Sequence, residues 1–129
     1  MPVDFTLDPV TRVVHSRAAG HVSEAEMAEH ARAIVALFAV GTLDASWAQL
    51  LDFSEAAEAA HISSDMIRRV AQYNPWPSTI RRVFVSPQEV IFGLLRMYQV
   101  FADLDAEHFF VARSTEEALE WLALHPPPP

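Results

Sequence analysis

The stretch LLDFSEAAEAAHISSDMI, residues 50–67, decides how the fold of this chain is interpreted. It begins inside a short apolar run, residues 47–53, whose length suits a buried central strand ending near Asp52. A crossover follows, and Ser63, Ser64 and Asp65 then have the composition of a helix start. Strands that alternate with helices indicate a parallel sheet, which usually carries function at the carboxyl ends of its strands.

The segments before this stretch predict an antiparallel hairpin and a helix. Residues 3–7 and 13–19 are extended runs with a turn signal between them. Ser23 and Glu26 have the spacing of a capping box, and Gly41 is expected to end the helix. The apolar residues expected to share one face of this helix are Met27, Ala31, Ile34 and Phe38.

The segments after it continue the alternation of strands and helices. Ser86 followed by Pro87 is a helix-start signal, and Ser114 with Glu117 is a second capping box. The expected elements are a strand at 82–85, a long helix at 87–104, a strand at 108–112 and a helix at 115–124. The order is ββαβαβαβα. It predicts one α/β domain, residues 1–124, with a mixed, mostly parallel five-stranded sheet and a disordered proline-rich tail at 125–129.

Composition excludes several classes of function. The chain has 129 residues and a net charge of −8, and its 9 basic residues are all arginine, which argues against nucleic acid and anionic membranes as partners. Cysteine is absent, so disulfides and thiolate chemistry are excluded. The first residues lack a signal-peptide pattern, and no apolar run is long enough to span a bilayer. We therefore expect a cytoplasmic protein.

Few residues stand out as chemical groups. Asp52 is a candidate strand-end carboxylate that faces a crevice, although it also suits a turn cap. Ser63 and Ser64 are candidate phosphate acceptors at a helix N-terminus, where capping is the commoner role of serine. No pair among the six histidines has the spacing of a helical zinc site, so no metal or other cofactor is predicted. The histidines are His15, His21, His30, His61, His108 and His125.

The predicted helix 87–104 carries more apolar surface than one sheet face needs. Trp76, between two prolines, is either a partner anchor or a lid over the edge of the core. The surplus apolar surface is either covered by the last helix and Trp121, forms a dimer or partner surface, or lines an apolar pocket. The residues expected at a dimer or partner surface are Ile91, Phe92, Leu95, Tyr98, Ala102 and Trp76.

Several segments in this order resemble the STAS domain, named for sulfate transporters and anti-sigma-factor antagonists. They are VDFTLDPVTRVVHSRAAGHVS at 3–23, LLDFS at 50–54, HISSDMI at 61–67, RRVFVSPQEVIFGLLRMYQVF at 81–101 and HFFVARSTEEALEWL at 108–122. More narrowly, the chain looks like small stand-alone bacterial proteins of unknown function with that fold. The resemblance implies helices packed against a mixed sheet and a protein–protein role.

In the classical antagonists a partner kinase phosphorylates a serine at the helix start, and Ser63 and Ser64 match that position. Asp65 stands where that pattern has glycine, and a carboxylate repels a neighbouring phosphoserine. Three hypotheses follow. The first is a non-enzymatic interaction module acting as a homodimer or on another protein, with the phospho-regulated antagonist as its variant. The second is a carrier of a small apolar, lipid-like ligand, and the third is an enzyme built around Asp52 and a histidine.

Overall fold

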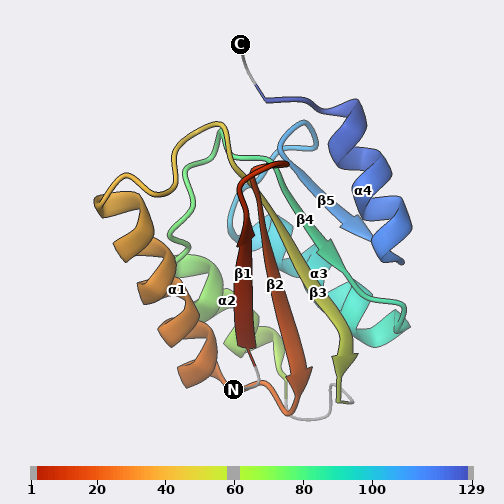
Figure 1. The fold of residues 1–129 in the computed structure, drawn as a ribbon. Coiled ribbons are helices and arrows are strands. Elements are labelled where there is room, and N and C mark those ends of the chain that lie inside the picture. Colours follow the sequence, from red (N-terminus) through yellow and green to blue (C-terminus); the bar gives the residue numbers. More distant parts are fainter. Residues whose placement is uncertain (1–2, 58–61, 128–129) are drawn as a thin grey trace.

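The computed structural model describes residues 3–57 and 62–127, which form a five-stranded sheet with four helices packed on it (Figure 1). The strands are β1 (Val3–Asp8), β2 (Val13–Gly20), β3 (Ala48–Ala56), β4 (Arg82–Val85) and β5 (Phe109–Ala112). The helices are α1 (Glu24–Ala39), α2 (Ser64–Gln72), α3 (Glu89–Phe101) and α4 (Thr115–Leu124). The predicted α/β class and the order ββαβαβαβα are confirmed.

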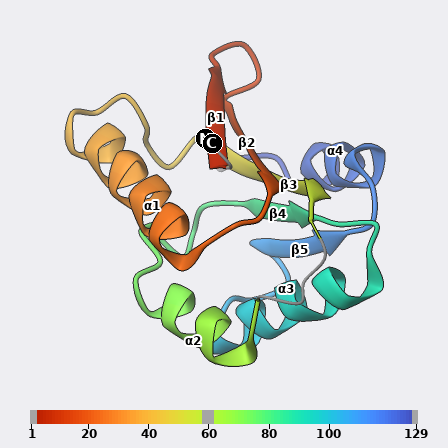
Figure 2. The same ribbon diagram turned by 90° about the horizontal axis from the view of Figure 1, so that it is seen from below.

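The sheet has the strand order β1-β2-β3-β4-β5, with β1 antiparallel to β2 and every other pair parallel. Figure 2 shows α1, α2 and α3 against one face of the sheet and α4 against the other. The second face is covered only in part, because α4 packs on β3, β4 and β5. The first face therefore carries three of the four helices.

Successive side chains of each strand point to opposite faces of the sheet, and this divides the core into two sides. Leu50 and Val83 point toward α4, where they pack with Trp121. Their neighbours Leu51 and Phe84 point toward α2 and α3. On this face a separate apolar cluster lies beneath α1. It contains Val14, Ile34, Leu43, Trp47, Trp76 and Ile80.

Serine caps begin three of the helices. Ser23 and Glu26 form the predicted capping box, in which each side chain bonds the backbone of the other residue. Ser63, rather than Ser64, caps α2, and its Oγ accepts a hydrogen bond from Met66 N at 3.1 Å. Ser114 Oγ accepts from the backbone of α4 in the same way.

Several predicted boundaries are wrong, and the helix expected at 87–104 spans only Glu89–Phe101. The strand of residues 47–53 continues to Ala56, so Asp52 lies within β3 and not at its end. The long helix begins at Glu89, because Ser86 is buried and extends the sheet pairing, donating its N–H to Ala112. The Oγ of Ser86 accepts a hydrogen bond from Gln88 N, which turns the chain before the helix starts.

The structure also corrects the predicted dimer or partner surface. Ile91, Leu95, Tyr98 and Trp76 are all buried inside the single chain, where they cannot meet a partner. Phe92 and Ala102 are partly buried and pack against the same cluster. The surplus apolar surface of α3 is covered by α2, which packs against it, while α4 and Trp121 lie across the sheet.

The end of the chain is held against the domain as far as His125. Arg81 donates a hydrogen bond to the carbonyl oxygen of His125 at 2.8 Å, and the His125 ring stacks on Trp121. Of the expected tail, the last two residues lie outside the described part of the chain. Across residues 3–57 and 62–127, none of the helices has the length and apolar character needed to cross a bilayer.

Candidate functional site

A cavity lies between the sheet and the three helices α1, α2 and α3. Its volume is about 60 Å³, which accommodates on the order of five water-sized groups. Most of the wall is apolar, and examples from the three helices and the sheet are Ala31, Met66, Val70, Leu94, Leu51 and Phe53. Pro75 and Trp76, from the loop after α2, also line it. Trp76 is therefore buried over the edge of the core, as the lid interpretation expected, and its ring meets Phe38 edge-on at 5.5 Å.

Polar groups enter this cavity from the sheet. Gln49 on β3 and Arg82 on β4 are partners in the parallel register, so their side chains lie next to each other on the same face. Gln49 is 1% exposed and Arg82 is 3% exposed. Arg82 donates hydrogen bonds to Gln49 Oε1 at 2.9 Å, Asn74 Oδ1 at 3.0 Å and Tyr98 Oη at 3.1 Å. All four side chains line the cavity.

The guanidinium of Arg82 is a buried charge whose three hydrogen-bond partners are all neutral. Within the described ranges, no carboxylate forms an ion pair with it. Its Cζ lies 5.1 Å from the ring centre of Phe84, 5.5 Å from Tyr98, 5.6 Å from Trp76 and 5.8 Å from Phe109. Burial lowers the pKa of Arg82, and Tyr98 partly opposes this, yet an arginine stays protonated at neutral pH.

His30 forms a second polar pair at the α1 side of the cavity. Its Nε2 lies 2.9 Å from the Oγ of Ser16, and both residues are buried. Burial, together with the nearby positive charge of Arg82, lowers the pKa of His30 to about 4. The imidazole is therefore neutral at physiological pH. Its ring also meets the ring of Phe5 edge-on at 5.7 Å.

The Ser16–His30 pair lacks the features of a nucleophile and base. Ser16 does not line the cavity, and it is fully enclosed by the core. No bond between His30 and a carboxylate is found in the part of the chain that the structure describes. A catalytic serine needs both an accessible hydroxyl and an oriented histidine. We interpret this pair as a satisfied polar contact in the core.

Tyr73 contributes another polar group to the cavity wall. Its hydroxyl is buried and has no hydrogen-bond partner among residues 3–57 and 62–127. Burial, and then the charge of Glu24, raise the pKa of Tyr73, so the phenol keeps its proton. Buried hydroxyl groups are almost always paired, which makes an unpaired one beside a cavity an indication of a binding site.

Of the residues that the sequence singled out, Asp52, Ser63 and Ser64 lie outside this cavity, whereas Trp76, Ile91, Leu95 and Tyr98 line it. Asp52 sits between Leu51 and Phe53 and points to the opposite face of the sheet, where its Oδ1 accepts from Ser54 N at 2.8 Å. This contact matches the turn cap that the sequence also suited at Asp52. Among the described residues, no hydrogen bond joins Asp52 to a histidine. Ser63 and Ser64 are both exposed at the start of α2, and Ser63 is occupied in capping.

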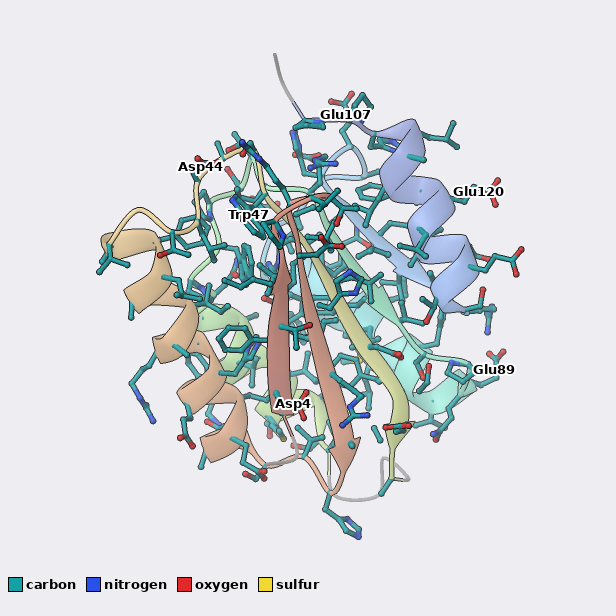
Figure 3. The ribbon with its side chains drawn as sticks, viewed as in Figure 1. Asp4, Asp44, Trp47, Glu89, Glu107 and Glu120 are labelled. Atoms are coloured by element: carbon teal, nitrogen blue, oxygen red, sulfur yellow. The ribbon has the colours of Figure 1, made fainter. Side chains whose placement is uncertain are left out.

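The histidines of the described residues do not gather into a metal site. His30 bonds Ser16 on one face of β2, whereas the neighbouring His15 points to the opposite face. His108 pairs with Asp105 at 2.8 Å on the surface. His61 lies outside the described residues. In the described ranges no group of three or more potential ligands is close enough to hold a metal ion. Figure 3 shows Glu89, Glu107 and Glu120 pointing outward at the edge of the domain.

Comparison with known proteins supports the fold. No family model matches the chain, and no curated protein is significantly similar to it in sequence. One solved structure, an uncharacterised DUF3478-family protein from Shewanella loihica PV-4 with a SpoIIAA-like fold, superimposes with a TM-score of 0.58. The alignment covers 93% of this chain and 91% of that one at 15% sequence identity. The chain therefore has a SpoIIAA-like fold, the STAS-like architecture that its sequence resembles.

Proposed function

We propose that this protein is a binding module for a small apolar ligand, held in the cavity between the sheet and helices α1, α2 and α3. One observation carries the proposal, namely that a mostly apolar cavity with a few converging polar groups lies inside a chain of only 129 residues. Apolar walls with a few convergent polar groups are the usual lining of small-molecule sites. The apolar wall would supply affinity, and Arg82, Tyr73 and His30 would orient the ligand.

The way the core is divided supports this proposal. A domain that needed only stability would fill the space over the sheet with apolar side chains. On this face, however, the cluster under α1 is separate from the cluster under α2 and α3. Buried polar residues, Gln49, Arg82 and His30, lie with the cavity on the same face. Polar groups in a core cost free energy, and a ligand that bonds them gives a reason for their presence.

A cavity-filling substitution tests the proposal. Ala31 lines the cavity from α1, whereas Ala36, on the same helix, is exposed. Ala31→Leu adds three carbons to the cavity wall, and Ala36→Leu adds the same three carbons to the surface. Native mass spectrometry after purification, and titration with small apolar compounds, should detect bound ligand in the wild type and in Ala36→Leu but not in Ala31→Leu. Equal binding by all three proteins would place the ligand elsewhere.

A homodimer or another protein partner remains a prediction. With the predicted α3 surface buried, the large apolar side chains exposed on this helix are Val90 and Val100, which do not form a contiguous patch by themselves. Light scattering at micromolar concentration would decide between a monomer and a dimer.

Phosphorylation of Ser63 or Ser64 also remains a prediction, and both hydroxyls lie at the surface where a kinase could reach them.

A further inference from the structure

We infer that the ligand is a short-chain carboxylic acid bound as its anion, with its carboxylate on Arg82 and its apolar tail in the cavity. This inference rests on the proposed binding function and adds the chemical class of the ligand. The observation behind it is the meeting of a buried, uncompensated cation with an apolar cavity.

The charge of Arg82 requires explanation. A buried ion is costly unless an opposite charge and hydrogen bonds compensate it. The three acceptors of Arg82 are a glutamine, an asparagine and a tyrosine, all of them neutral. The four surrounding aromatic rings attract the desolvated cation, but they carry no formal negative charge. A carboxylate in the cavity would supply the missing negative charge, since arginine matches a carboxylate in both charge and geometry.

The hydrogen-bond geometry leaves room for such an anion. A guanidinium has five N–H donors, and the bonds to Gln49, Asn74 and Tyr98 use one donor on each of its three nitrogens. One N–H therefore remains on each terminal nitrogen of Arg82, and these two donors are available to a carboxylate. The hydroxyl of Tyr73, buried and unpartnered in the described structure, is a further donor on the wall of the same cavity.

Size and charge define the class of acid. The cavity of about 60 Å³ holds on the order of five water-sized groups in total, at about 12 Å³ for each, so it limits the tail of the acid to a few carbons. One guanidinium balances one negative charge, and His30 is neutral at physiological pH and adds none. A phosphate monoester would bring nearly two negative charges to a single cation. A monoanionic branched or straight short-chain acid fits both limits.

Calorimetric titration with matched probes tests this inference. Isovalerate and isoamyl alcohol have the same branched tail, and they differ in carrying a carboxylate or a neutral hydroxyl. At neutral pH the wild-type protein should bind isovalerate at least about tenfold more tightly than isoamyl alcohol, because hydrogen bonds to charged groups exceed neutral ones. Isoamyl phosphate should bind more weakly than isovalerate. Tighter binding of the phosphate would overturn the carboxylate assignment.

Two variants assign the preference to Arg82. Arg82→Met should remove the preference for the acid, while Arg81→Met should keep it, because Arg81 is also buried but does not line the cavity. Wild-type protein that binds the alcohol as tightly as the acid would overturn the inference and leave the proposed function standing. Binding of none of the probes would count against both. The wild-type comparison decides the matter even if a variant does not fold.

Discussion

Arg82 donates a hydrogen bond from Nε to Gln49 Oε1 over 2.9 Å, and the two residues are register partners in β4 and β3. Both side chains are buried, so the glutamine is the nearest fixed acceptor for a cation that has left water. This pair holds the guanidinium in one orientation. Its remaining donors then point in fixed directions, which is what a binding site for a planar anion requires.

Replacing this acceptor should destabilise the protein. In Gln49→Leu, the Nε–H of Arg82 loses its partner inside the core, and we expect the free energy of unfolding to fall by about 1–3 kcal/mol. Gln72→Leu, an exposed change of the same chemistry at the end of α2, should stay within about 0.5 kcal/mol of wild type. Urea unfolding measures both values. A loss in Gln49→Leu no larger than in Gln72→Leu would show that the buried bond matters little.

The buried imidazole of His30 predicts a pH dependence. Its pKa in the folded state is about 4, below the value of about 6.5 in an unfolded chain. Between these values the unfolded chain binds the extra proton, so stability is fully present above pH 6.5 and is lost as the pH falls toward 4. The shift corresponds to about 3 kcal/mol for this buried group.

Comparison of unfolding curves from pH 7 to pH 4 tests this prediction. His30→Gln should show a smaller loss of stability across that window than the wild type, because glutamine does not titrate. His15→Gln, on the other face of β2, should keep the wild-type slope. Identical slopes for the wild type and His30→Gln would mean that His30 titrates normally.

The two serines at the start of α2 should differ in their effect on stability. Ser63 caps the helix and Ser64 is its first residue. Ser63→Ala should therefore cost about 1 kcal/mol, the usual value of a lost serine cap, whereas Ser64→Ala should be close to neutral. Thermal unfolding of the two single variants measures the difference. The same loss in both would argue that the cap is shared.

The sequence predicts the fold well because local signals and the sheet pattern agree. Strand β4 and helix α4 have the predicted bounds, and the capping box at Ser23 is confirmed. The start of α3 is predicted wrongly because both the backbone N–H and the hydroxyl of Ser86 form hydrogen bonds. It pairs with β5 through its backbone and turns the chain through its hydroxyl, and a local pattern does not reveal the first of these.

The site is harder to predict because it depends on which residues the sheet places side by side. Arg82 looks like half of an exposed arginine pair at a strand start, and Gln49 like an interruption in an apolar run. A polar residue inside a strand that is buried on both faces was the available signal. Periodicity predicts a partner surface for the apolar residues of α3 because the position of α2, which covers them, follows from tertiary packing.

Binding of a small acid as its anion in the cavity between the sheet and helices α1 to α3 should change the surroundings of the side chains that line the cavity. Titration of methyl-labelled methionine with isovalerate, followed by NMR, tests it most directly. Met27 and Met66 line the cavity, whereas Met97 packs against the same core without lining it. We predict saturable shifts of the Met27 and Met66 methyl signals and little change at Met97. Unchanged signals at Met27 and Met66 at saturating isovalerate would contradict the claim.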